Sequence, residues 1–563
     1  MIMKRFRIIL YGIILVAFIF TSCKKLIPDS KIDTSLTEDQ ASISLSRLQA
    51  QGIAVYNYIP QGYDHIDGAM FASGTDEADF AIPGSNIKLF NDGSWNAIVN
   101  PDDVWAFNYR GIRLANLFLN NSTDYATITL RDTSTPAKRT AYFDGLKDIE
   151  WMRNEAQVLK AYYYFELIKR YGGVPLITEA VSVTDDKNIP RSSYDEVVTY
   201  ILQLLNGAIP NLQTNWATYR ATSFGRITKG MAMALKARVL LYWASPLNNP
   251  TNDLDRWKQA AQAAHDVISL NTYVLEANYG NLFIGALSHS SKESIFAYMT
   301  GNNNPPEKKN YPISTSGGST GNCPSGNLVD DYEYKTGLPF SWSTLTPGEN
   351  PYANRDPRLA FSVVVNNSTW TNRTIECWIG GKDGPGTSQT STTGYYLKKF
   401  LTDKLDLATN KTAVHSWILF RYGEVLLNYA EAMNEAYGPD GDFFNNGRTA
   451  RWAINLVRTR VTMPAVVATS NLEMRAKIKH ERRIELAFEE HRPWDVRRWG
   501  LNDAKAALGS TIKGVRITKT GTVFDYSVFD VGTRVFNDRN LLYPIPQSEI
   551  LLSNGVIIQN PQY

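Results

Sequence analysis

The stretch "IKHERRIELAFEEHRPWDVRRWG", from Ile478 to Gly500, concentrates acidic, basic, histidine and tryptophan side chains. Glu481, Glu485 and Glu489 follow one another at i, i+4 and i+8, so a helix would place all three on one face. Two such carboxylates would suit general acid and base catalysis, but neighbouring arginines depress a carboxyl pKa and weaken it as a general acid. Six basic and five acidic residues alternate here. We predict that they form ion pairs inside the fold, because mixed signs leave no net field for a nucleic acid.

Signals for a metal or a nucleophile are weaker. Asp440 and Asp442 would offer oxygens to calcium, but the full ligand loop is missing and a solvated turn explains them as well. The six histidines include no H-E-x-x-H pair and form no cluster with cysteine of the kind that binds zinc. The segment 317–321 matches G-x-S-x-G without a flanking strand and helix. We predict no cofactor and no catalytic residue.

The charge balance argues against polyanionic partners. Of the 58 basic side chains, three (Lys4, Arg5 and Arg7) precede an apolar block typical of a signal peptide, and the remainder equals the 55 acidic ones. A neutral domain without a basic face is a poor nucleic-acid binder. Apart from Cys23, only Cys323 and Cys377 are present, which is too few for a disulfide framework. These two either pair or remain separate thiols.

The N-terminus has the pattern of a secreted lipoprotein. An apolar block at 8–20 is shorter than the roughly 20 residues that span a bilayer as a helix. Small residues then precede Cys23, as in the lipobox of bacterial lipoproteins, although Phe20 departs from the usual leucine. We predict a signal peptide over 1–22, acylation of Cys23 and a polar tether over 23–35. Two or three acyl chains would hold the protein firmly on a membrane.

Helical periodicity dominates the remaining chain, which we predict to be one domain over 36–563. The predicted helices cover 36–58, 101–121, 144–171, 193–208, 228–244, 253–270, 416–437, 447–460 and 471–491. Pro101 would occupy the first helical position of the second of them. Most of the helices follow one another in pairs joined by short turns, with small residues where neighbours must approach closely. This pattern predicts a mainly α fold built from helical hairpin repeats of the tetratricopeptide kind.

The segment 271–415 has a different composition. It is rich in Gly, Asn, Ser, Thr and Pro, with short β-like runs such as "FSVVV". A segment of this length is too long for a structureless loop. We predict an irregular insertion lobe with short strands, packed on a helical scaffold formed by about 36–270 and 416–563.

Five stretches together resemble the SusD/RagB family of outer-membrane nutrient-binding lipoproteins. They are "EAQVLKAYYYFELIKRYGGVPLIT", "ANRDPRL", "RYGEVLLNYAEAMNEA", "ERRIELAFEEHRPWDVRRWG" and "LYPIPQSEI". Their order and the leading lipobox also agree with the family. The resemblance implies an architectural role for the charged stretch, in agreement with the ion pairs expected from its spacing.

The resemblance further implies a binding protein without enzymatic activity. It would be lipid-anchored on the exterior of a Bacteroidota-type outer membrane, over a SusC-like TonB-dependent barrel as its partner. Ligands of this family are mostly glycans, and peptides in some members. The ligand contacts vary between members, so they must be inferred from side-chain chemistry.

Sugars present apolar faces and a rim of hydroxyl groups, which suits exposed aromatic rings beside short polar side chains. Two predicted loop regions offer that mixture, and ordinary packing is the alternative for each aromatic residue. The first gives Tyr63, Asp64, His65, Trp95 and Asn96, and the second gives Tyr298, Asn303, Tyr311 and Trp342. Family members also place a tryptophan in the first region, which favours Trp95.

Two other classes of protein share parts of this pattern. An all-α secreted glycan-degrading enzyme would also be rich in aromatic residues, but it needs a carboxylate pair or a Tyr/His base facing a cleft. A repeat scaffold that binds only protein would need no sugar site at all. Incubation with glycans and titration with soluble oligosaccharides separate these alternatives.

Overall fold

The computed structural model describes residues 44–129, 131–181, 188–220, 223–386 and 388–563. The predicted signal peptide, Cys23 and the tether lie outside these ranges. Within them, no helix combines the length and the apolar character that crossing a membrane requires.

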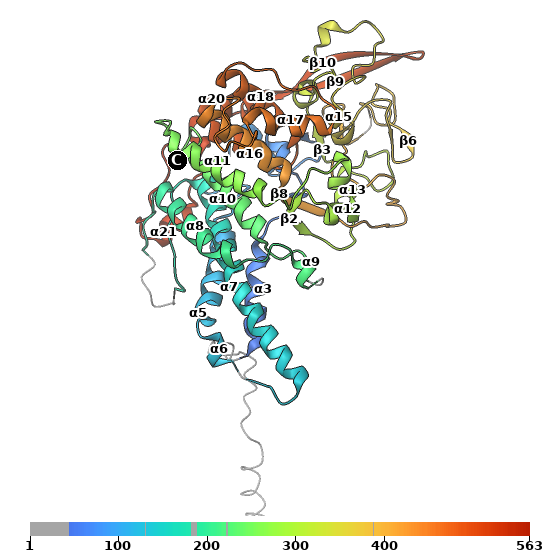
Figure 1. The fold of residues 1–563 in the computed structure, drawn as a ribbon. Helices are drawn as coiled ribbons and strands as arrows, with labels where there is room; N and C mark the ends of the chain where they lie inside the picture. The colour runs from blue at the N-terminus through green and yellow to red at the C-terminus, as the bar shows by residue number, and fades with distance from the viewer. Residues whose placement is uncertain (1–43, 130, 182–187, 221–222, 387) are drawn as a thin grey trace, which may run out of the picture.

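The fold is mainly helical, as predicted (Figure 1). The longer helices are α3 (Leu45–Ala54), α5 (Trp105–Asn121), α7 (Pro136–Tyr171), α8 (Tyr194–Ala208), α10 (Lys229–Ala244), α11 (Leu254–Ser269), α16 (Tyr422–Tyr437), α17 (Ala450–Arg460), α18 (Asn471–Glu485), α19 (Arg492–Trp499) and α20 (Leu501–Leu508). The shorter ones are α4 (Ile87–Asp92), α6 (Tyr125–Ile128), α9 (Trp216–Tyr219), α12 (Gly285–Ser290), α13 (Pro305–Asn310), α14 (Gly326–Asp331), α15 (Pro357–Ser362) and α21 (Gln547–Leu552).

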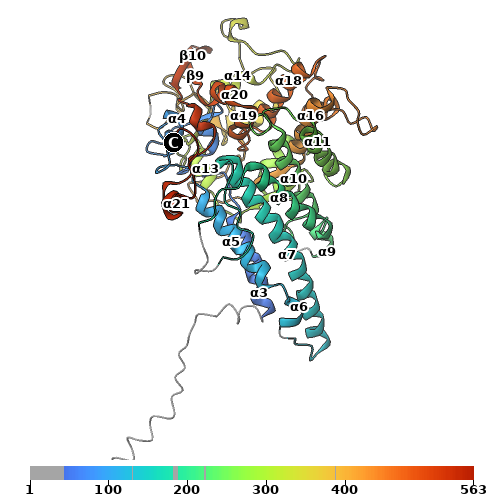
Figure 2. The same ribbon diagram turned by 90° about the vertical axis from the view of Figure 1, so that its left-hand side faces the viewer.

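The long helices pack in sequence order. α7 packs against α5 and α8, α10 against α11, and α16 against α11, α17 and α18. Figures 1 and 2 show α3, α5 and α7 extending together from one end of the molecule, with α16 and α18 at the other. Neighbouring helices thus bury their apolar faces against each other, which confirms the predicted helical hairpins.

Local sequence signals set several helix ends. The Ser193 hydroxyl accepts the N–H of Glu196, and the Glu196 carboxylate accepts that of Ser193, so a complete capping box starts α8. At the start of α10 the Thr228 hydroxyl accepts the N–H of Met231, without a reciprocal contact. α7 ends where predicted, at Gly172, which adopts a positive φ of 72°.

Several predicted helix boundaries are wrong. α7 begins at Pro136, eight residues before the predicted start at 144, because the Thr135 side chain caps the helix there and proline is favoured at the first helical position. α5 begins at Trp105, not Pro101, because Asp102 and Asp103 turn away to make tertiary contacts. The first six residues of the predicted helix 416–437 form strand β8 (Ser416–Arg421) instead. The predicted helix 471–491 stops at Glu485, and a turn precedes α19. At the boundaries of α5, β8 and α18 a tertiary partner outweighs the helical pattern.

The strands form two-stranded antiparallel sheets among the described residues. They are β1 (Ala78–Phe80) with β3 (Asn322–Pro324), β2 (Ser294–Met299) with β8, β4 (Val363–Val364) with β7 (Tyr396–Leu397), β5 (Thr369–Trp370) with β6 (Arg373–Thr374), and β9 (Thr511–Thr520) with β10 (Val523–Thr533). The predicted lobe therefore contains short strands, as expected. The longest ladder, β9 with β10, was not predicted; it forms a hairpin that projects from the top of the molecule in Figure 1.

Cys323 and Cys377 are both buried and form no disulfide, so in this structure they remain two separate thiols. Burial raises the pKa of the Cys323 thiol to about 11. A thiol in such an environment stays protonated and unreactive.

The carboxylates of α18 form a buried ionic core. Glu485 is fully buried and accepts hydrogen bonds from Arg358 at 2.9 Å, Arg421 at 2.7 Å and Arg460 at 2.5 Å. Glu481 accepts from Arg358 at 2.5 Å and from Arg458 at 2.8 Å. These contacts confirm the predicted ion-pair scaffold. The arginines, however, come from other segments of the chain, not from the helix itself.

Charge compensation keeps this core ionised. Burial alone would raise the pKa of Glu485, but Arg460, Arg421 and Arg358 outweigh burial and hold the pKa well below its usual range. Burial would likewise lower the pKa of Arg421, yet the surrounding glutamates raise it. The buried glutamates and the buried arginines therefore depend on each other to remain charged.

Replacing Glu485 by glutamine tests the ionic core. The substitution keeps the side-chain shape but leaves three buried arginines short of a negative charge, so we expect a loss of about 3–5 kcal/mol in the free energy of unfolding. Urea denaturation measures it. As a control, Asp132→Asn removes an exposed ion pair with Lys138 and should leave the transition midpoint unchanged. Equal stability of the two variants would contradict the assigned role of Glu485.

Candidate functional site

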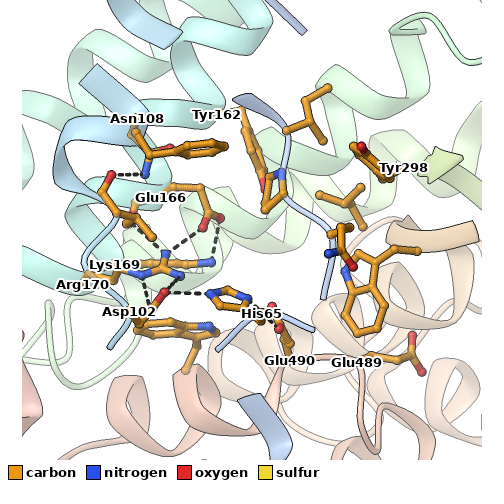
Figure 3. A pocket seen from close by; sticks show the side chains of 18 of the residues that line it. His65, Asp102, Asn108, Tyr162, Glu166, Lys169, Arg170, Tyr298, Glu489 and Glu490 are labelled. Atoms are coloured by element: carbon orange, nitrogen blue, oxygen red, sulfur yellow. Dashed lines mark hydrogen bonds and ion pairs between the residues drawn. The ribbon is translucent and has the colours of Figure 1, made fainter. Parts of the chain in front are cut away.

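A pocket of about 490 Å³ opens where several elements meet. It is bordered by the loop before and after Pro60, the start of α5, one face of α7, strands β2 and β8, and the turn between α18 and α19. Figure 3 shows charged side chains along one wall and Tyr298 across from them. The size suits one or a few sugar rings or a comparably small ligand.

Six charged groups alternate in sign along that wall. Lys169 donates to Glu166 at 2.6 Å, and Glu166 accepts from Arg170 at 2.7 Å. Arg170 also donates to Asp102 at 2.8 Å. His65 bridges Asp102 and Glu490, with 2.8 Å between the atoms at each contact. We call these six residues the charged row.

The charged row fixes the imidazole of His65 in its cationic form. Burial alone would lower the pKa of His65, but the carboxylates of Glu490 and Asp102 outweigh burial and raise it to about 10. Lys169 shows the opposite balance. Burial lowers its pKa to about 8, and the carboxylate of Glu166 opposes the shift only in part.

Two backbone features orient side chains of the charged row. The Asp103 carboxylate accepts the N–H of Trp105 and the hydroxyl of Tyr171, so α5 starts late and Asp102 faces Arg170. In the turn after α18, Phe488 and Glu490 both adopt positive φ angles, 66° and 61°. Such backbone strain in non-glycine residues concentrates at functional sites. Here it directs Glu490 toward His65.

Aromatic rings complete the pocket. Tyr298 and Phe107 are 37% and 38% exposed, so both rings are accessible to a ligand. Trp417 is the cross-strand partner of Tyr298 in the β2–β8 ladder and is buried. A Cβ at Gly62 would collide with the Trp417 indole, so only glycine allows this loop to lie flat on the ring. Trp494 carries Lys169 and Arg170 above its ring, at 4.8 and 4.6 Å from the centroid.

The structure brings three of the sequence-predicted ligand residues to this pocket. Asp64, His65 and Tyr298 line it, and they come from the two separate regions that the sequence singled out. Asp64 is exposed, and its carboxylate accepts from the side chain of Gln61. The two predicted regions therefore meet in space.

Three predicted aromatic residues belong to the hydrophobic core instead. Trp95 is 2% exposed and packs against Phe90 and Tyr543, with ring centroids 5.0 and 4.9 Å away. Tyr63 donates to the Ser416 carbonyl at 2.8 Å, and the fully buried Tyr311 donates to another carbonyl. In this conformation none of the three rings offers a face to a ligand, so we do not include them in the proposed site.

The other predicted residues have local structural contacts. Asn96 accepts the N–H of Ile98 at 2.9 Å in its own turn. Asn303 donates to the Thr300 hydroxyl at 2.8 Å. Trp342 lies in the insertion lobe, where its N–H donates to Asp330 at 3.0 Å. None of these three residues lines the pocket.

The weak calcium candidates lie in a turn held by other partners. Both oxygens of Asp440 accept from Arg451 at 2.7 Å. Asp442 accepts the N–H groups of Asn446 and Gly447 at 3.1 and 3.0 Å. Across the described parts of the chain, no three acidic, histidine or cysteine side chains cluster in a way that would hold a metal ion.

The sequence prediction missed most of the charged row. Glu166, Lys169 and Arg170 have the i, i+3 and i, i+4 spacing of helical ion pairs, and that signal was available. Asp102 was assigned to the first turn of a helix, and Glu490 to the end of another. Phe107 was not singled out, although it lies in the predicted helix 101–121.

Two family models match the chain. One is described as the SusD family and covers residues 283–563. The other is described as starch-binding and associating with the outer membrane, and it covers residues 29–241. Together they span both the helical scaffold and the lobe.

Individual proteins show the same similarity. A SusD-like protein of Formosa agariphila is 27% identical over 378 residues, which covers 63% of this chain and 67% of the relative. A SusD-like protein of Bacteroides ovatus is 24% identical over 498 residues, covering 86% and 81%. The crystal structure of a SusD-like protein from Bacteroides fragilis superposes with a TM-score of 0.78 at 27% identity, over 94% of this chain and 99% of that one. A second structure from that organism, described as a SusD-like carbohydrate binding protein, gives 0.73 at 24% identity, over 92% and 99%.

The pKa of His65 predicts a pH dependence of stability. Because the folded pKa of about 10 exceeds the ordinary value of about 6.5, the stabilisation by the imidazolium is complete below pH 6.5 and is lost as the pH rises through 10. We expect His65→Gln to have a lower free energy of unfolding than the parent protein at pH 7. This difference between the two proteins should narrow toward pH 10.

Urea denaturation at pH 6.5, 8 and 9.5 measures the difference in the free energy of unfolding between His65→Gln and the parent protein. His265→Gln is the control, because burial and Arg448 lower the pKa of His265 and its ring is neutral throughout that range. If the difference in the free energy of unfolding between His65→Gln and the parent protein does not narrow from pH 6.5 to 9.5, the folded protein does not raise the pKa of His65.

Proposed function

This chain belongs to the SusD/RagB family, and from that premise we propose that it binds oligosaccharides in the pocket beside the charged row. It releases them unchanged to a SusC-like TonB-dependent barrel in the outer membrane. The protein is held at the cell exterior by lipid on Cys23. The description of one matching family model as starch-binding and outer-membrane-associated supports both the ligand class and the location.

The observation that carries the proposal is the meeting of Tyr298 and Phe107 with polar side chains in one pocket. Exposed rings suit the apolar faces of sugars, and hydrogen-bonding groups suit the hydroxyl rim. Asn108 and Gln61 add amide groups to the lining. One neighbour in structure is itself described as carbohydrate binding.

The electrostatics of the pocket favour binding over catalysis. Glycoside hydrolysis needs one carboxyl group with a raised pKa as general acid and a second one free to act as base or nucleophile. Burial would raise the pKa of Glu166 and Asp102, but Lys169, Arg170 and His65 hold both below the usual range. Glu490 is engaged by His65. This pattern supports a protein that does not cleave its ligand.

Substitution of the exposed rings tests the binding site. We expect Tyr298→Ala and Phe107→Ala each to weaken the binding of an oligosaccharide by about tenfold, because each removes one stacking face. Isothermal titration against a panel of soluble oligosaccharides gives the affinities. Phe443→Ala is the matched control, since this ring is exposed but does not line the pocket.

Three outcomes would contradict the proposal. Saccharide binding that is unaffected by both substitutions would place the site elsewhere. The absence of heat with every saccharide would favour the protein-binding scaffold. Shortening of glycan chains on prolonged incubation with the pure protein would favour the enzyme.

Replacing Cys23 by alanine tests the anchor. Acylation needs the cysteine thiol, so we expect the variant to lose label from radioactive palmitate and to leave the membrane fraction of the expressing cells. The parent protein should retain both properties. Retention of the label by the variant would refute acylation at this position.

A further inference from the structure

Every cationic side chain that lines the pocket already has a carboxylate partner. In the charged row, Lys169, Arg170 and His65 alternate with Glu166, Asp102 and Glu490, so the row as a whole is neutral. The remaining cation, Arg238, donates to Glu424 at 2.7 Å. The lining thus offers no cation whose charge is left uncompensated.

A negatively charged ligand would have to break one of these pairs to gain a full ionic contact. Asp102 and Glu166 are 2% and 5% exposed. Taking a cation from either of them would leave a buried carboxylate uncompensated, which is strongly unfavourable. The row therefore resists recruitment by sulfate or carboxylate groups.

The remaining carboxylates of the lining also disfavour a negatively charged ligand. Among the described residues, Asp64 and Asp103 have no cationic partner, and both are exposed at the pocket. Glu489, also in the lining, is neutralised by Arg421 and Lys399. Burial holds the pKa of His491 well below its ordinary value, so its ring adds no positive charge. The lining thus carries a negative excess.

From this arrangement we infer that the pocket selects neutral saccharides and discriminates against acidic ones, such as those with uronic acid or sulfate groups. The inference rests on the proposed function, because it concerns the same site. Asp64 and Asp103 are its specificity-determining residues. Their negative charge at the rim of the pocket repels an acidic sugar, and inside the pocket no uncompensated cation attracts it.

Matched pairs of oligosaccharides provide the test. Each pair shares one backbone, for example oligogalacturonide with its full methyl ester, or glucuronic acid-substituted xylo-oligosaccharide with the unsubstituted form. At low ionic strength we expect the acidic member of a bound pair to bind roughly tenfold more weakly or worse. The difference in affinity between the neutral and the acidic member should shrink in about 0.5 M salt, because exposed charges are then screened.

Single substitutions locate the effect. Asp64→Asn and Asp103→Asn should each reduce the ratio of neutral to acidic affinity by roughly two- to tenfold. Asp525→Asn changes the net charge equally on the exposed β10 strand and should leave the ratio unchanged. If Asp525→Asn changed the ratio as much, whole-protein charge would explain the selectivity and the inference would fail.

The remaining outcomes separate this inference from the proposed function. Equal or tighter binding of the acidic members would overturn the selectivity while leaving saccharide binding intact. If neither neutral nor acidic members bind, the proposed function fails, and the inference fails with it.

Discussion

The sharing of two buried carboxylates among four arginines determines how this chain is assembled. Arg358 reaches Glu481 and Glu485 across 123 and 127 residues of sequence, and Arg421 reaches Glu485 across 64. A buried charge without its partner costs about 3–5 kcal/mol, so each of these segments must arrive in register. The insertion lobe, strand β8 and helices α17 and α18 are thereby fixed to one point. Apolar packing alone would tolerate small shifts between them, whereas the ionic contacts do not.

The same part of the chain joins the scaffold to the pocket. Immediately after α18, the strained turn at Phe488 and Glu490 divides two adjacent glutamates between different tasks. Glu489 turns inward to Arg421 and Lys399, and Glu490 turns to His65, which lies 425 residues earlier in the chain. His65 continues the chain of charges to α7. The position of the pocket wall is therefore set by the core, and the loop around His65 is held at both ends of its imidazole ring.

Sequence patterns predicted several helix ends that depend on neighbouring residues, although they missed the local cap that starts α7 at Pro136. The capping box at Ser193 and the glycine stop after α7 are of this kind. The pattern failed at 101–104, at 416–421 and after Glu485, where the deciding partner is remote. Asp102 is drawn to Arg170 on another helix, and 416–421 pairs with a strand more than a hundred residues away. Local periodicity carries no information about such partners, so these ends were beyond its reach.

Residue type alone was an even weaker guide to the site. A tryptophan in a polar loop was expected to be a sugar platform, yet Trp95 is covered by Phe90 and Tyr543, and the exposed rings are Phe107 and Tyr298. Exposure is decided by which elements close over a ring, and the sequence does not state it. The charges follow a simpler rule. Because the buried cations of the pocket wall already hold carboxylates, the wall offers no uncompensated cation, and the recognition that we propose rests on ring faces, hydroxyl contacts and the acids at the rim.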